Sequence, residues 1–397
     1  MNNVGKCSAS EAFLISSQHD FTASDTPSKS AAASTRDTTA CQRNSLAVES
    51  PRTPASELLG SRKQRLLTLV LLIVAVIAPF VSLGFGAAAI PFTEALQVTW
   101  LKLTGGDLSG WNTSTVAIIW LNRLPRILTA YGVGIILGVS GVAMQSIIRN
   151  PLAEPYVLGI SSGASAGAAT AIVVIGSSTV FLVTSSAFVG ALVATLLVLW
   201  IGSGRSGTSL RLILAGIAIG FIFQAFTNLL IISANTAETA QSVVFWTLGS
   251  LTRADTPQAL AVLGIAVALA GALWLFAPYL DALASGDQTC IGIGLNPAVL
   301  RFAMLIPISF AVGAAVASSG GIGFIGLVIP HLVRPLVSHR HRPLILATAL
   351  VSAVFLLITD TVARTALAPV EIPIGIITAL LGAPFLVVMA KKSRALT

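Results

Sequence analysis

Long apolar segments alternate with short polar ones from residue 65 to the end of the chain. One of them, "LLTLVLLIVAVIAPFVSLG", approaches the roughly 20 apolar residues that a helix needs to cross a bilayer. The amphipathic stretch 90–103 is expected to lie at a membrane surface. The pattern predicts ten membrane helices, of which the eighth is short and bounded by Gly and Pro, near residues 65–84, 125–148, 159–180, 181–202, 211–232, 258–277, 302–319, 322–337, 343–361 and 373–390.

The composition agrees with a membrane location. Hydrophobic residues fill 55% of the 397 positions and charged residues only 10%, whereas soluble domains carry about 25% charged residues. A soluble protein with so few charges could not cover its surface with polar groups. We therefore expect an all-α polytopic membrane protein with about ten transmembrane helices.

Basic side chains fall unevenly on the two predicted sides of the membrane. The side richer in Lys and Arg is normally cytoplasmic, so both termini are expected in the cytoplasm, as an even number of helices requires. The richer side holds thirteen basic residues and the other side five: Arg62, Lys63, Arg65, Arg149, Arg205, Arg211, Arg301, Arg334, Arg340, Arg342, Lys391, Lys392 and Arg394, against Lys102, Arg123, Arg126, Arg253 and Arg364. Because these residues lie in loops and tails, the net charge of +8 predicts no nucleic-acid partner.

Residues 1–60 differ from the rest of the chain. They are rich in Ser, Thr and Ala and contain no apolar stretch long enough to span a membrane. Such a segment buries too little surface to offset its ordering entropy, so 1–60 is predicted to be a disordered cytoplasmic tail. It lacks the pattern of a secretory signal, and it is either a regulatory tail or sequence upstream of the true start codon. Residues 61–397 are predicted to form the transmembrane domain.

The stretch "GGIGFIGLVIP" matches G-x-G-x-x-G, the spacing of a dinucleotide-binding turn. That turn needs a preceding strand and an acidic residue about 20 positions later. Here a membrane helix precedes it, and no acidic residue follows before Asp360. Nucleotide binding is therefore not expected. Small residues allow helices to approach closely in membranes, so this stretch is predicted to serve helix packing or gating through Gly321, Gly323, Gly326 and Pro330.

The other short motifs give little support for a catalytic, metal or phosphate-binding site. Two G-x-S-x-G matches at Ser161 and Ser165 suggest an intramembrane serine peptidase, but His331 is the single histidine within a predicted membrane helix. His339 and His341 have no neighbouring Cys or carboxylate to complete a metal site. The three cysteines show no metal or disulfide spacing, and a phosphate-binding loop is absent. No metal or cofactor is therefore predicted, and energy for any transport is expected from another chain.

Several stretches together resemble the iron-chelate and vitamin B12 uptake permeases, the membrane subunits of type II ABC importers. The resemblance covers about residues 65–392 and leaves the tail unexplained. It is carried by "RLPRILTAYGVGIILGVSGVAMQSIIRNPLAEPYVLGISSGASAGA" at 123–168, "RLILAGIAIG" at 211–220, "GIGFIGLVIPHLVRPL" at 321–336 and "DTVARTALAPVEIPIGIITALLGAPF" at 360–385.

The resemblance implies a transport subunit rather than an enzyme. Family members have ten membrane helices with both termini in the cytoplasm of a bacterium, and two permeases, identical or related, line one pathway. Two ATP-binding subunits dock from the cytoplasm and hydrolyse ATP, and an extracytoplasmic substrate-binding protein docks outside. A ferric siderophore is the expected substrate, with vitamin B12 or haem as alternatives. Two other classes stay open: an ATP-independent channel or secondary carrier, and the serine peptidase.

The segment 283–301, "LASGDQTCIGIGLNPAVLR", corresponds to the family's contact with its ATPase. Asp287 and Gly294 match family positions, while Cys290 and Ile291 depart from a small Ala and a common Arg. The alternative is an ordinary solvated loop. The residues predicted to form the coupling loop are Gly286, Asp287, Gln288, Gly294 and Leu295.

Three of the five basic residues on the poorer side are candidate docking residues: Arg123, Arg126 and Arg364. The spacing of three between Arg123 and Arg126 lets both project from a similar side of a helix. The resemblance implies that all three match outer arginines that meet glutamates of the binding protein. The alternatives are contacts with lipid headgroups, or a simple i, i+4 pair between Arg364 and Asp360.

Overall fold

The computed structural model describes residues 54–86, 88, 90–202, 209–337 and 340–394. The first 53 residues of the predicted tail, and His339, lie outside these. No strand occurs among the described residues, which confirms the all-α class. The helices are α2 (Pro54–Gly84), α3 (Phe92–Thr104), α4 (Thr113–Ala117), η1 (Ile118–Arg123), α5 (Leu124–Ile148), η2 (Pro155–Leu158), α6 (Ile160–Ala169), η3 (Thr170–Val174), α7 (Val180–Gly202), α8 (Ser209–Ile232), α9 (Ala237–Thr247), α10 (Thr256–Leu275), α11 (Ala277–Ser285), α12 (Asp287–Gly292), α13 (Pro297–Ser319), α14 (Ile325–Val333), α15 (His341–Thr365) and α16 (Ile374–Arg394).

Seven of the described helical stretches are long and apolar enough to cross a membrane: Gln64–Gly84, Thr113–Ile148, Val180–Gly202, Leu210–Ile232, Thr256–Leu275, Pro297–Ser319 and His341–Thr365. Ile160–Val174 and Ile374–Met389 are shorter apolar helices. The multi-pass prediction is confirmed, but the expected helix over 322–337 is shortened to nine residues in α14. Nine residues rise only about 14 Å, less than half of the hydrocarbon core. The backbone breaks before α14 because Gly320 and Phe324 both have positive φ angles, 69° and 70°.

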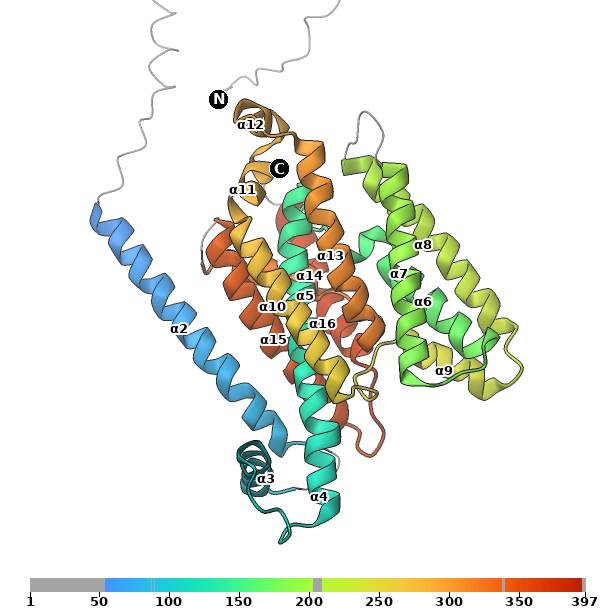
Figure 1. The fold of residues 1–397 in the computed structure, drawn as a ribbon. Coiled ribbons are helices and arrows are strands. Elements are labelled where there is room, and N and C mark those ends of the chain that lie inside the picture. Colours follow the sequence, from blue (N-terminus) through green and yellow to red (C-terminus); the bar gives the residue numbers. More distant parts are fainter. Residues whose placement is uncertain (1–53, 87, 89, 203–208, 338–339, 395–397) are drawn as a thin grey trace, which may run out of the picture. The chain divides into compact units, whose positions relative to one another are not determined.

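Helix α5 lies at the centre of the fold and packs against α10, α13, α14 and α15 (Figure 1). Helices α6 to α9 form a second group beside the first, in which α6 packs against α7 and α8 (Figure 1). Most residues of α5 are buried and most are apolar, which is typical of a helix packed on all sides. Its glycines allow backbones to meet: a Cβ on Gly141 would lie 1.9 Å from the Gly326 carbonyl oxygen of α14. Small residues therefore set the contact between α5 and the half-length α14.

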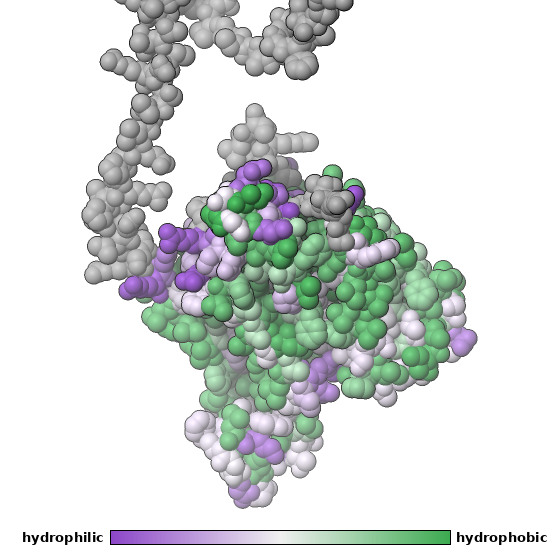
Figure 2. Space-filling model, turned by 45° about the horizontal axis from the view of Figure 1, so that its top comes forward, coloured by the Kyte–Doolittle hydropathy of each residue, from purple (hydrophilic) through white to green (hydrophobic). Residues whose placement is uncertain are grey.

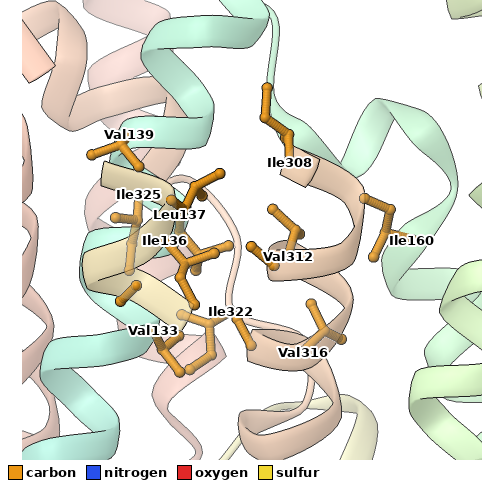
Figure 3. Close-up of a cluster of buried hydrophobic side chains, with 14 of the residues drawn as sticks. Val133, Ile136, Leu137, Val139, Ile160, Ile308, Val312, Val316, Ile322 and Ile325 are labelled. Atoms are coloured by element: carbon orange, nitrogen blue, oxygen red, sulfur yellow. The ribbon is translucent and has the colours of Figure 1, made fainter. Parts of the chain in front are cut away.

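The buried core joins the two groups of helices. Side chains of α5, α6, α13 and the segment before α14 converge in one apolar cluster, which includes Ile136, Ile160, Val312 and Ile322 (Figure 3). Outside this core, large hydrophobic side chains are exposed along α2, α7, α8 and α16. Figure 2 shows hydrophobic residues covering the side of the bundle, with hydrophilic residues gathered toward two ends. Such a belt is stable in a bilayer and costly in water.

Candidate functional site

The three singled-out arginines lie together where α5 begins. Arg126 on α5 donates from Nε to Asp360 Oδ1 of α15, at 2.7 Å. Its Nη1 lies 3.0 and 2.8 Å from the two carboxylate oxygens of Glu371, in the connection between α15 and α16. We call Arg123, Arg126, Asp360, Arg364 and Glu371 the arginine cluster. One guanidinium of α5 thus contacts α15 and the loop after it, both more than 230 residues later in the sequence.

Arg364 and Arg123 complete the arginine cluster through the end of α2. Arg364 Nε lies 3.6 Å from Asp360 Oδ2, so the i, i+4 pair considered as an alternative role for Arg364 is present. Its Nη2 donates to the Ser82 carbonyl oxygen at 3.0 Å and to the Ser82 hydroxyl at 2.5 Å. Arg123 donates to the carbonyl oxygens of Leu83 and Ala88. Three cations therefore share two carboxylates and a set of backbone carbonyls.

Burial limits what the arginine cluster can bind directly. Arg123, Arg126 and Arg364 are only 2%, 3% and 4% exposed. Glu371 is the accessible member, with 35% of its side chain exposed. That these arginines bind a docking partner stays a prediction. Because they are buried, such a partner could reach them only after a local rearrangement. A partner carboxylate would have to displace an internal acceptor, and Glu371 is the more accessible of the two carboxylates.

The predicted coupling segment lies where α5 ends, and it is helical rather than an open loop. Helices α11 and α12 meet at Gly286, whose φ of 114° an L side chain rarely adopts. Asp287 begins α12, and its Oδ1 lies 2.5 Å from Arg301 Nη2 and 3.4 Å from Arg149 Nη2. Its carboxylate is thus already paired within the chain. Gln288 is exposed and free to meet a partner.

The end of α12 presents apolar side chains to solvent. Ile291 and Ile293 are 58% and 61% exposed. Gly294 reverses the chain with a φ of 79°, and the Leu295 N–H donates to the Cys290 carbonyl at 2.8 Å. Figure 1 shows α12 beyond the ends of the long helices. Apolar side chains there are not covered by their own fold, which is typical of a surface that meets another protein.

The glycine-rich stretch forms the break between α13 and α14, and two side chains stabilise its irregular backbone. Glu154 Oε1 accepts the Phe324 N–H at 2.8 Å. The Tyr156 hydroxyl accepts from the Ile322 N–H at 3.1 Å and donates to the Ile322 carbonyl at 3.0 Å. The amides of Ile322 and Phe324 thus already have partners inside the chain.

Four residues of this stretch were predicted to serve packing or gating. Gly321 and Gly326 have no room for a side chain, because a Cβ would lie 2.9 Å from the Thr247 carbonyl and 2.8 Å from the Leu137 carbonyl. Gly323 is less crowded, and Pro330 is buried inside α14. The sequence analysis did not single out Glu154 and Tyr156. The signal that could have found Glu154 is a lone acidic residue between two apolar segments in "NPLAEPY".

The serine motifs belong to a helix contact. A Cβ on Gly163 would lie 2.4 Å from the Gly190 carbonyl of α7, so α6 and α7 touch through their backbones. Ser165 Oγ donates to the Ser161 carbonyl at 2.9 Å, and the His331 ring packs against Phe385 with centroids 5.7 Å apart. The described residues contain no group of three or more His, Cys, Asp or Glu that could hold a metal ion.

This fold, a bundle of membrane-crossing helices with one half-length helix and an exposed helical segment at one end, is that of a multi-pass membrane protein. Residues 70–392 match the FecCD transport family, and the chain belongs to that family. The resemblance noted in the sequence is thereby confirmed.

Individual relatives cover most of the chain. It is 37% identical to a probable iron chelatin transport system permease protein of Helicobacter pylori, over 80% of this chain and 96% of that protein. It is also 37% identical to the hemin transport system permease protein of Yersinia pestis, over 84% and 98%. A solved metal-chelate type ABC transporter in an inward-facing conformation matches with a TM-score of 0.71 and 32% identity, covering 82% of this chain and 98% of that one.

Proposed function

We propose that this chain is the permease subunit of an ATP-binding-cassette importer that moves an iron–siderophore complex across the cytoplasmic membrane. Membership of the FecCD transport family supports transport as the function. The names of the relatives, which include iron chelatin, hemin and vitamin B12 permeases, support a chelate or tetrapyrrole substrate. Vitamin B12 and haem are the alternative substrates.

In the proposed assembly the chain crosses the membrane about ten times, and both termini are cytoplasmic. The end with α11 and α12 then faces the cytoplasm, and the arginine cluster faces outward. Two permeases, identical or related, enclose one pathway that opens alternately to each side. Two separate ATP-binding subunits supply the energy, and an extracytoplasmic binding protein delivers the substrate.

The observation that carries this proposal is the surface of α12. Ile291 and Ile293 are more than half exposed, and α12 lies beyond the ends of the long helices (Figure 1). An apolar groove on an ATP-binding subunit would cover them, whereas a channel or carrier that acts alone leaves them in water. Within the described membrane-crossing helices the one carboxylate, Asp360, is already paired with Arg126 and Arg364. That arrangement supports an external energy source, because ion-coupled carriers place ionisable groups on their ion pathway.

The experiment is reconstitution of the permease with its ATP-binding subunits and binding protein in liposomes. Uptake of a radiolabelled ferric hydroxamate chelate is measured with ATP, without ATP and with a non-hydrolysable analogue, beside haemin and cobalamin. ATP-dependent uptake of the chelate supports the proposal. Uptake of haemin or cobalamin but not of the chelate would show that the proposed substrate is wrong. Uptake by the permease without the other subunits would show that it is not part of an ATP-driven importer.

A further inference from the structure

A polar chain links α11 to two membrane helices at the end where α5 finishes; its His341 and Ser146 side chains are buried, and Asp281 is 42% exposed. His341, the first residue of α15, has Nδ1 2.5 Å from Asp281 Oδ1 of α11. Its backbone N–H donates to the same oxygen at 3.1 Å. On the other side of the ring, Nε2 lies 2.5 Å from Ser146 Oγ of α5. We call these three residues the Asp281–His341–Ser146 clamp.

The same residue types form serine hydrolase triads, but this geometry does not favour hydrolysis. The Ser146 side chain is buried, and its hydroxyl donates to the Val142 carbonyl one helical turn earlier, at 3.0 Å. A nucleophile must be reachable by its substrate. The clamp therefore connects structural elements instead of attacking a bond.

The clamp holds the middle of α11, and a second contact holds the start of α12. Asp281 fixes α11 to His341 and, through it, to Ser146. Asp287, at the start of α12, fixes the segment to Arg301 of α13. Helix α11 also packs directly against α5 and α15. Hydrogen bonds, an ion pair and packed residues therefore connect α11 and α12 to three membrane-crossing helices, α5, α13 and α15, and a movement of α12 can be transmitted to them.

We propose that the Asp281–His341–Ser146 clamp transmits the movement of α11–α12 to α5 and α15, and that His341 is the positioning residue at its centre. This inference rests on the proposed function, in which an ATP-binding subunit moves α12. Loss of one partner leaves a buried polar atom without its hydrogen bond and weakens the connection of α11 to α5 and α15. The subunits would still assemble, because the surface of α12 is unchanged. ATP hydrolysis would then continue with less transport.

Two substitutions of His341 each remove one of its two side-chain hydrogen bonds and keep the other. In His341→Asn the amide nitrogen can replace Nδ1 and keep the bond to Asp281, but it cannot reach Ser146. In His341→Gln the longer side chain can replace Nε2 and keep the bond to Ser146, but it loses Asp281. Ser146→Ala removes the α5 contact alone. Its matched control is Ser165→Ala, because Ser165 is a buried serine that also bonds a carbonyl one turn earlier but has no histidine partner in the described structure.

The measurement is the number of ferric hydroxamate chelates imported per ATP hydrolysed by the full reconstituted complex. A coupling free energy of ordinary size corresponds to a change of about fivefold or more. We expect that ratio to fall at least about fivefold in His341→Asn, His341→Gln and Ser146→Ala, while Ser165→Ala matches wild type. Co-purification of the ATP-binding subunit should stay within about twofold, which a general folding defect would not allow.

The outcomes separate this inference from the proposed function. A wild-type complex that shows no ATP-driven uptake overturns the proposed function and the clamp with it. A wild-type complex that imports with ATP, beside clamp variants whose ratio is unchanged, overturns the clamp alone. Loss of uptake that only follows loss of assembled complex also overturns the clamp, since it would show a structural role.

Discussion

Arg126 of α5 and Asp360 of α15 form a buried ion pair, with Nε 2.7 Å from Oδ1 and side chains 3% and 0% exposed. The pair is shared, because Arg364 approaches the second Asp360 oxygen and Glu371 accepts from Arg126. A buried pair adds little net stability compared with apolar residues, but removal of one partner leaves an uncompensated charge. The pair therefore makes α5, α15 and the loop after α15 depend on one another.

Asp360→Asn should strongly destabilise the folded permease. The substitution leaves Arg126 and Arg364 buried with one carboxylate fewer, and loss of one partner of a buried pair costs about 3–5 kcal/mol. We expect a lower melting temperature in detergent and a smaller folded yield. Glu371→Gln is the control, because Glu371 is partly exposed and should cost much less. Equal melting of Asp360→Asn and wild type would show that the pair contributes nothing.

The docking prediction is best tested at Glu371. If the arginine cluster receives a carboxylate of the binding protein, Glu371 competes for Arg126, and Glu371→Gln should speed association of the binding protein. The gain should be largest at low salt, since ions screen the attraction. Association rates measured by surface plasmon resonance at two salt concentrations provide the check. An unchanged rate at both, with the permease folded, would remove Arg126 from the docking surface.

The class of fold could be predicted from the sequence because a bilayer demands about 20 apolar residues in each crossing, and hydropathy reveals them. A short eighth helix bounded by Gly and Pro was also predicted, but not that α14 has only nine residues. This length follows from positive φ angles at Gly320 and Phe324 and from Glu154, which bonds Phe324 from 170 positions away. Nothing local in the sequence specifies such a contact.

The candidate site was predictable in its location but not in its burial. A rule based on charge counts placed Arg123, Arg126 and Arg364 at the outer boundary, and the structure brings the three together where α5 begins. The acceptors that bury them, Ser82 and Glu371, come from distant segments that only folding brings together. Likewise, the sequence did not reveal that Asp287 of the predicted coupling segment pairs with Arg301; its contact with an ATP-binding subunit stays a prediction.

Ile291 and Ile293 should be more important for binding the ATP-binding subunit than Asp287. Replacing both isoleucines with Asp puts charges where an apolar groove is expected, and truncation of a central interface residue costs about 2 kcal/mol or more. We expect at least about a tenfold loss of affinity in pull-down titrations, with the permease melting as wild type. Gln288→Asp is the matched control, since it adds charge at an exposed polar position of the same helix. Equal loss in the control would point to charge rather than to the apolar contact.

Gly141→Ala should separate α5 from α14 and weaken the folded state. The new Cβ would lie 1.9 Å from the Gly326 carbonyl oxygen, a backbone atom that cannot rotate away. Overpacking of this kind typically costs about 1–3 kcal/mol, and more where backbone must move. Gly271→Ala in α10 is the matched control, because no atom lies within 4 Å of its added methyl group and alanine favours helix. Thermal melting in detergent should therefore fall for Gly141→Ala and hold or rise for Gly271→Ala. Equal melting of the two variants would mean that α14 can shift away from α5 at little cost, which would favour a movable half-helix over a fixed packing contact.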